Sequence, residues 1–174
     1  MQPVTRLQRT PIYQHYFFQK IEKDEQVMEL ALRLAQMGAY WQEVPVGAVL
    51  LDEQRRVIGM GVNHTLYSHD PTQHAEMMAL RDASTFIGNY RLPGSHLYVS
   101  LEPCMMCMGA LLHARVERVL YGASDPKTGV CHSVLHHDQY AQLNHHTIIE
   151  GGLLQERSAA LLRDFFKARR GRNR

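Results

Sequence analysis

The stretch SHLYVSLEPCMMCMGALLHARVERVLYGA, residues 95–123, predicts a strand, a helix and a second strand in close succession. Residues 95–101 and 116–123 are short apolar runs rich in β-branched and aromatic side chains, which is typical of strands. Between them, residues 104–115 predict a short helix. Because helices that alternate with strands pack as layers on a sheet, this stretch favours an α/β fold.

The same alternation continues on both sides of this stretch. A polar DEQRR turn between two apolar runs predicts a β-hairpin, and three longer patterns predict helices. We expect helices at residues 24–37, 69–84 and 153–170, the hairpin at 45–63, and a last strand, TIIEGG, at 147–152. The first helix begins at Asp24 as its N-cap and ends near Met37, with Gly38 as the stop.

The length and composition indicate a soluble protein with one domain. A chain of 174 residues buries roughly 70% of its unfolded surface and needs no disulfides. Its three cysteines are an odd number without framework spacing, which favours a reducing, cytoplasmic location. The apolar run VGAVLL is far shorter than a membrane span, and no signal-peptide pattern follows Arg6 and Arg9.

The charge is unevenly distributed, although the net charge is only +2. Residues 163–174 contain six basic side chains and one acid, Asp164. Such a basic end often contacts a polyanion, and the alternative is a solvated terminus that touches nothing.

The CxxC pair Cys104 and Cys107 suggests a metal site. Both thiols lie on one side of the predicted helix, whose N-terminus lowers thiol pKa values and favours thiolate ligands. A second helix start supplies His74, and three ligands with an open position are typical of catalytic zinc. Glu76, beside the metal but not bound to it, would handle protons.

Other interpretations of the cysteines remain open at this point. The pair could be a redox dithiol, or two unrelated core residues, since free cysteine is among the most buried residue types. A closed structural site would take its fourth ligand from Cys131 or from a histidine in residues 132–146.

Longer phrases of the sequence resemble one family. The pairing of H-x-E with P-C-x-x-C is the known signature of zinc nucleobase deaminases. Five phrases resemble the bacterial tRNA adenosine deaminases of the cytidine/deoxycytidylate deaminase superfamily: EVPVGAVL, HDPTQHAEMMALR, LYVSLEPCMMCMGALLHAR, DPKTG and LLRDFF. The resemblance covers residues 24–170, whereas VCHS at 130–133 departs from the small residues usual in the family.

This resemblance implies a fold and an activity. The fold is a three-layer α/β/α sandwich around a five-stranded mixed sheet, and the enzyme is a cytoplasmic homodimer. It edits tRNA by converting the wobble adenosine of the anticodon to inosine. The chain would then comprise an N-terminal extension (1–23), a deaminase domain (24–170) and a basic end (171–174).

The resemblance also implies roles for individual residues. His74, Cys104 and Cys107 resemble the ligands of one zinc ion per chain, and Glu76 resembles the general acid and base. The residues that resemble substrate contacts are Asn63 on the flipped adenine, Val44 and Pro45 in the pocket wall, Asp125 beside the target nucleotide and Phe166 near the RNA. Asn63 could also simply end a strand, Asp125 could form a turn with Pro126, and Phe166 could serve packing.

The implied reaction is a hydrolytic deamination. Zinc lowers the pKa of bound water from 15.7 to roughly 7, so that hydroxide can attack C6 of adenine. Glu76 carries the water proton to N1 and then to the leaving ammonia. The rival functions are deamination of a free base or nucleotide and a non-enzymatic zinc module that binds RNA; only the enzymes need Glu76.

Overall fold

A computed structural model describes residues 6–136 and 142–172, and its centre is one five-stranded sheet. The order of the strands is β2-β1-β3-β4-β5. β1 pairs antiparallel with β2 and β3, while β4 and β5 continue parallel to β3. The strands are β1 Gly47–Leu51, β2 Val57–Val62, β3 His96–Leu101, β4 Arg118–Ala123 and β5 Ile148–Gly151. The expected mixed sheet is therefore confirmed.

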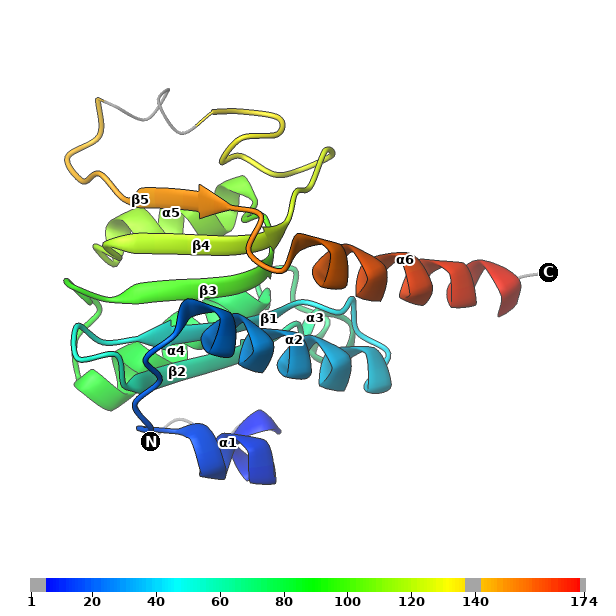
Figure 1. Cartoon of the computed structure of the whole chain (residues 1–174), viewed down its shortest axis with the longest axis horizontal. Helices are drawn as coiled ribbons and strands as arrows, with labels where there is room; N and C mark the ends of the chain where they lie inside the picture. Colours follow the sequence, from blue (N-terminus) through cyan, green and yellow to red (C-terminus); the bar gives the residue numbers. More distant parts are fainter. Residues whose placement is uncertain (1–5, 137–141, 173–174) are drawn as a thin grey trace.

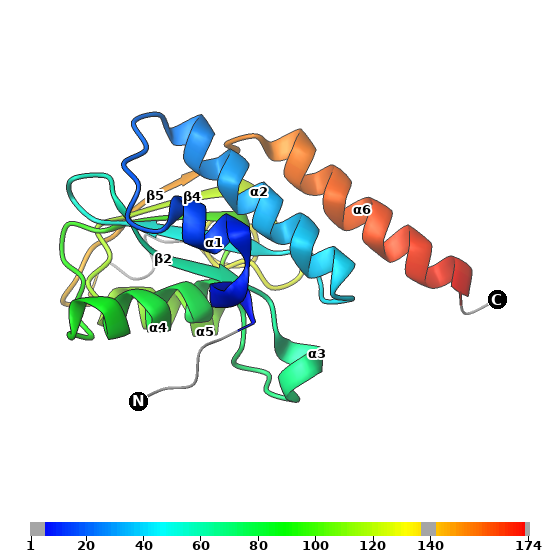
Figure 2. The ribbon, with the colours of Figure 1, turned by 90° about the horizontal axis from the view of Figure 1, so that it is seen from below.

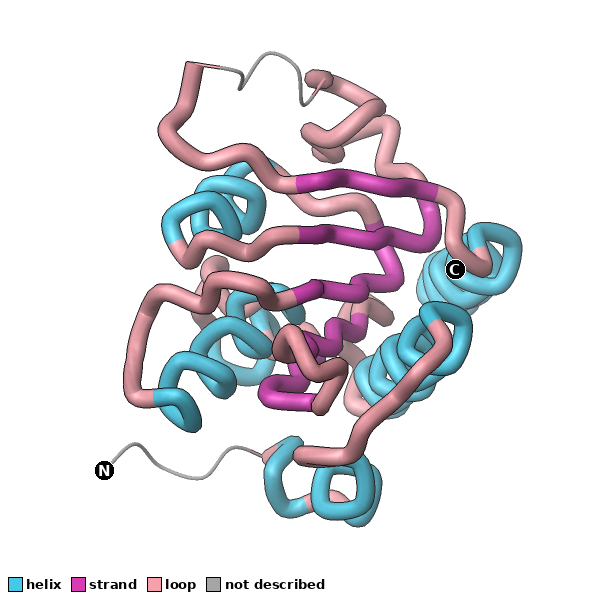
Figure 3. Tube along the Cα trace, turned by 60° about the vertical axis from the view of Figure 1, so that its left-hand side comes forward, coloured by secondary structure: helices cyan, strands magenta, loops and turns pink. Residues whose placement is uncertain are grey.

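Helices cover both faces of this sheet, which confirms the three-layer α/β/α sandwich (Figures 2 and 3). The helices α2 (Asp24–Tyr40) and α6 (Gln155–Arg172) lie side by side on one face. The helices α4 (Ala75–Ile87) and α5 (Met105–His113) cover the other face. Much of α6 extends beyond the ends of the strands (Figure 1).

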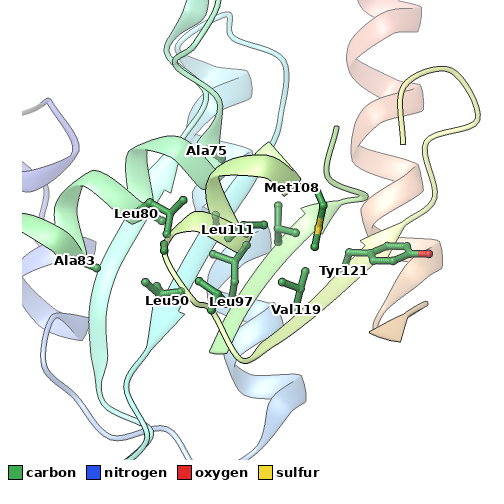
Figure 4. Packing of buried hydrophobic residues seen from close by; sticks show 14 of the residues in the cluster. Leu50, Ala75, Leu80, Ala83, Leu97, Met108, Leu111, Val119 and Tyr121 are labelled. Atoms are coloured by element: carbon green, nitrogen blue, oxygen red, sulfur yellow. The ribbon is translucent and has the colours of Figure 1, made fainter. Parts of the chain in front are cut away.

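An apolar core lies between the sheet and each helix layer, because successive side chains of a strand point to opposite faces. Leu50 and Leu97 pack toward α4 and α5, as Figure 4 shows, together with Leu80 and Leu111. Their strand neighbours pack toward α2 and include Val49, Leu51 and Tyr98. The strands between the two cores are consequently buried on both sides.

Two glycines let α4 approach β2 very closely. A Cβ atom on Gly59 would overlap the carbonyl oxygen of Ala79, and one on Gly61 would overlap that of Ala75. Because these are backbone atoms of the helix, neither contact could be relieved by a side-chain rotation. The two glycines therefore fix the height of α4 above the sheet.

The structure corrects both predicted ends of α2. Its N-cap is Lys23, so Asp24 is the first residue of the helix and not the cap. Gly38 was predicted to stop this helix, but the helix continues to Tyr40 and Gly38 is buried inside it. A Cβ atom on Gly38 would lie 2.9 Å from Cγ1 of Val62. The glycine thus serves close packing against β2 instead of ending the helix.

The N-terminal segment, residues 6–23, has structure that its weak periodicity did not predict. It forms a short 3₁₀ turn, η1 (Leu7–Arg9), and the helix α1 (Pro11–Tyr16), with Thr10 as the N-cap. The chain then runs along β2, where the N–H of Phe18 donates to the carbonyl of Val57 and the N–H of Ile21 donates to that of Arg55. The segment is therefore packed against the sheet.

No helix in the described parts of the chain is both long enough and apolar enough to cross a membrane.

Candidate active site and metal centre

Two helix N-termini meet above the sheet and bring three ligand atoms together. His74 is the N-cap of α4, and Cys104 is the N-cap of α5. Nδ1 of His74 lies 3.6 Å from Sγ of Cys104 and 3.5 Å from Sγ of Cys107, and the two sulfur atoms are 3.7 Å apart. The cluster thus joins residues that are 30 and 33 positions apart in the sequence.

These three distances fit a tetrahedral zinc ion. With usual zinc–ligand bond lengths, tetrahedral geometry separates two sulfurs by about 3.8 Å and a sulfur from a nitrogen by about 3.6 Å. Each edge of the observed triangle matches within about 0.1 Å, and thiolates with imidazole are the ligands that zinc prefers. The three side chains are therefore arranged to fill three coordination positions of a tetrahedral zinc ion and to leave the fourth position open.

No fourth protein ligand joins this cluster within the described residues. Cys131 is buried outside it, and burial raises the pKa of its thiol to about 12. His132 instead contacts the hydroxyl of Tyr121, and Nε2 of His145 contacts the carbonyl of Val116. Part of the stretch 132–146, from 137 to 141, lies outside the described residues. Among the described residues, the arrangement favours an open site over a closed structural one.

Glu76 lies in the first turn of α4, beside the cluster but outside the ligand set. Its side chain is only 4% exposed, and this burial raises the pKa of the carboxyl group to about 7. Its carboxyl group also hydrogen-bonds with Cys107. A carboxylic acid with this pKa can both accept and release a proton at neutral pH.

Asn63 is anchored next to the same helix start. It follows β2 and is buried, and its Oδ1 accepts a hydrogen bond of 2.9 Å from the N–H of Ala75. This hydrogen bond holds the amide group of Asn63 one residue from His74. Val44 is half-buried and packs against the core under α4 and α5.

Asp125 and Phe166 are not part of the cluster. The carboxylate of Asp125 accepts hydrogen bonds from the N–H groups of Lys127 and Thr128, as a turn residue does. The same loop nevertheless passes the cluster, since Gly129 forms a β-bridge with Cys104. Phe166 is 43% exposed on α6 and has an edge-on ring contact with Phe165.

Comparisons with known proteins identify the family. The sequence profile of the cytidine and deoxycytidylate deaminase zinc-binding region matches residues 21–123. A tRNA-specific adenosine deaminase of Haemophilus influenzae is 47% identical over 149 residues, which cover 86% of each chain. This chain belongs to the tRNA-specific adenosine deaminases.

Solved structures show the same fold around related chemistry. The structure of a tRNA:A34 deaminase, from a study of A-to-I editing at the wobble position, superposes with a TM-score of 0.75. It is 42% identical and covers 79% of this deaminase and 99% of its own chain. A guanine deaminase from Bacillus subtilis has a TM-score of 0.57 at 38% identity and covers 59% of this chain and 66% of its own.

In this deaminase the hydrogen bond between the two cysteines shifts their pKa values in opposite directions. The hydrogen bond between the sulfur atoms of Cys104 and Cys107, together with one to His74, lowers the pKa of Cys104 to about 4 against the opposing effect of burial. The same hydrogen bond raises the pKa of Cys107. Thiols must lose their protons to bind a metal, so metal binding at this pair depends on pH.

Glu102 supports the site, and the sequence analysis missed it. This carboxylate is 2% exposed and accepts hydrogen bonds from the N–H groups of Asp125, Cys131, His132 and Ser133 at 2.7 to 3.0 Å. It holds the loop after β4 against the start of α5. The one signal in the sequence that could have identified Glu102 is its position after an apolar strand and directly before Pro-Cys.

Glu43 has the same role on the other side of the site. It is buried and accepts hydrogen bonds from the N–H groups of Leu66 and Tyr67 at 3.1 and 2.9 Å. These groups lie at the start of the short helix α3, residues Thr65–Ser68. Glu43 therefore fixes α3 next to Asn63.

Proposed function

We propose that this deaminase converts adenosine to inosine at the wobble position of a tRNA anticodon. The observation that carries this proposal is the triangle of His74, Cys104 and Cys107 with the buried carboxyl group of Glu76 beside it. The assignment of tRNA as the substrate is supported by a tRNA-specific relative that matches 86% of this chain.

The reaction joins water to C6 of adenine and releases ammonia. One zinc ion per chain, held by these three ligands, would supply a water acidic enough to lose a proton near neutral pH. Glu76 takes that proton and delivers one to N1 of the base. It then accepts the proton of the new hydroxyl group on C6 and passes it to the departing nitrogen as the C–N bond breaks.

The remaining predicted residues would bind the nucleotide. Since Oδ1 of Asn63 already accepts from Ala75, its Nδ2 group would donate to the flipped base. Val44 would form part of the pocket wall with Pro45. Asp125 would meet the nucleotide next to the target, which the passage of its loop along Cys104 supports.

Phe166 and the basic end would meet the RNA outside the pocket. Phe166 lies in the C-terminal part of α6, where it and residues 167–171 are exposed. This role would give 171–174 a function separate from the deaminase domain at 24–170, with 1–23 as an extension. In keeping with the family resemblance, we further propose a cytoplasmic homodimer.

The test is a deamination assay on a tRNA with an ACG anticodon. The expected result is that the wobble adenosine is read as guanosine in the cDNA, with one ammonia released per edited tRNA. Guanine, cytosine and deoxycytidylate serve as rival substrates. Ammonia from one of these, without tRNA editing, would contradict the proposal, and RNA binding without ammonia would indicate a non-enzymatic zinc module.

A further inference from the structure

Four side chains from three separate segments stack against one another near the site. The guanidinium carbon of Arg6 lies 4.2 Å from the ring centroid of Trp41. The ring of Trp41 meets His64 edge-on at 6.3 Å, and His64 lies 4.7 Å from Tyr67 at a tilt of 41°. We call Arg6, Trp41, His64 and Tyr67 the stacking platform.

The outer end of the stacking platform is open to solvent. The side chain of Tyr67 is 69% exposed, although large aromatic rings usually gain by burial. Its backbone is nevertheless fixed, because its N–H donates to the buried Glu43. The ring is thus presented at a defined place while most of its surface remains free for a partner.

The stacking platform lies beside the proposed substrate pocket. His64 directly follows Asn63, and its N–H donates to the carbonyl of Gln73 at 2.9 Å. Gln73 in turn precedes the ligand His74. Figure 2 shows α3, the end of α2 and the start of the described N-terminal segment on the same side of the molecule.

The chemistry of these four side chains matches single-stranded nucleic acid. Aromatic rings stack on any base, and an arginine adds attraction to both phosphate and π-faces. A protein partner would instead favour a larger continuous apolar patch. Bases next to a flipped adenosine in an anticodon loop are unpaired and available for stacking.

We propose that the stacking platform binds an unpaired RNA base that flanks the target adenosine, with Tyr67 as the stacking residue and Arg6 and Trp41 as its support. This inference rests on the proposed function. It assigns a role to the N-terminal segment, because Arg6 belongs to residues 6–23.

The first experiment measures binding of an anticodon stem-loop RNA to the zinc-loaded protein. Base–aromatic stacking contributes about 1–3 kcal/mol per base, so Tyr67→Ala should weaken binding by roughly 5-fold to 150-fold. Tyr67→Phe keeps the ring and should bind like the unmodified protein. Tyr90→Ala is the matched control, since Tyr90 is also an exposed tyrosine, at 63%, beside an arginine but after the far end of α4.

The second experiment identifies the contacted base by a double-mutant cycle. Tyr67→Ala is combined with RNAs that carry one abasic position at each loop nucleotide in turn. If Tyr67 stacks on a base, removing that base should cost much less in Tyr67→Ala than in the unmodified protein. Additive losses at every position would overturn the inference.

The results for the unmodified protein and for the variants distinguish failure of this inference from failure of the proposed function. If the unmodified protein neither binds nor deaminates the stem-loop, the proposed function fails. If it does both and Tyr67→Ala matches Tyr90→Ala, only the stacking platform is refuted. A change in sedimentation on Tyr67→Ala would also overturn the inference, because it would assign this surface to a second copy of the chain.

Discussion

Glu76 is an acid placed where almost no water can solvate its charge. Replacing it with glutamine keeps the volume and removes the proton carrier. We expect Glu76→Gln to lower kcat by at least about 10²-fold, the usual loss for a general base. Zinc content by metal analysis and the thermal midpoint should stay near those of the unmodified protein. Turnover that survives the change would remove Glu76 from the proton path.

Cys131 tests whether the ligand set is complete. Because its sulfur lies outside the triangle of ligand atoms, Cys131→Ala should retain zinc, whereas Cys107→Ala should lose it. The cavity left by Cys131→Ala should cost stability, in the range of about 1–2 kcal/mol for a small side chain. X-ray absorption that shows three sulfur neighbours would contradict this assignment.

The sequence predicted which residues form the cluster better than it predicted the residues that support it. His74, Cys104 and Cys107 lie in short motifs at helix starts, so local spacing was sufficient to find them. Glu102 and Glu43 owe their positions to hydrogen bonds with segments about 20 to 30 residues away. No local pattern records such pairings, and a lone glutamate usually indicates solvent exposure.

At the scale of elements, the distance between α4 and β2 decides the position of His74. A methyl group on Gly61 would overlap the backbone at Ala75, one residue after His74. Gly61→Ala should therefore destabilise the protein by about 1–3 kcal/mol, as overpacking does, and weaken zinc binding. Calorimetry and competition with a chelator measure the two effects.

Gly109→Ala is the matched control for this change. Gly109 lies inside α5, and an added Cβ would meet no atom within 4 Å. Alanine is the better helix former, so this variant should gain about 0.5–1 kcal/mol and keep its zinc. An equal effect of both substitutions would mean that the close approach of α4 is not what places the ligand.

Element ends were harder to predict than element types. The strands at residues 95–101 and 116–123 and the helix between them are present, since strong periodicity identifies them. Gly38 was misread as a stop because a glycine that ends a helix and one that packs against a strand look alike in sequence. The helix α1 was missed because six residues are too few for a periodic signal.

At the scale of the whole molecule, Asp24 ties three elements together. It accepts hydrogen bonds from Tyr98 of β3 at 2.6 Å, Arg55 at 2.8 Å and Arg118 of β4 at 2.9 Å. Burial opposes its ionisation, but these partners outweigh that effect and hold its pKa below the usual 3.8. The ionised group thus stabilises the fold, fully at pH values above about 3.8, and this contribution is lost as the pH falls through the lowered pKa.

Thermal unfolding across pH tests this role. Asp24→Asn should lower the thermal midpoint at neutral pH, and the difference from the unmodified protein should shrink below about pH 3.8. Glu25→Gln is the control, because Glu25 is an exposed carboxylate in the same first turn of α2. A difference that is constant down to pH 2 would show that the charge of Asp24 is not what matters.

The C-terminal part of α6 should serve binding more than folding. In the described part of α6 only Ser158 is fully buried, and residues 166–171 are exposed. Ending the chain at Phe166 should therefore leave the thermal midpoint nearly unchanged. It should flatten the salt dependence of tRNA binding by about two to three units of the log–log slope, if two to four basic side chains contact phosphates. Equal slopes with and without residues 167–174 would identify them as a solvated end.

The hydrogen bonds between the N-terminal segment and β2 also bear on self-association. β2 is the last strand on its side of the sheet, and an unpaired edge of this kind is a template for pairing with another copy of the same sheet. Phe18, Gln19 and Ile21 already occupy backbone groups of residues 55–57. Residues 6–23 thus cover the start of this edge, so a version without them should be more prone to edge-to-edge aggregation while it keeps its metal ligands.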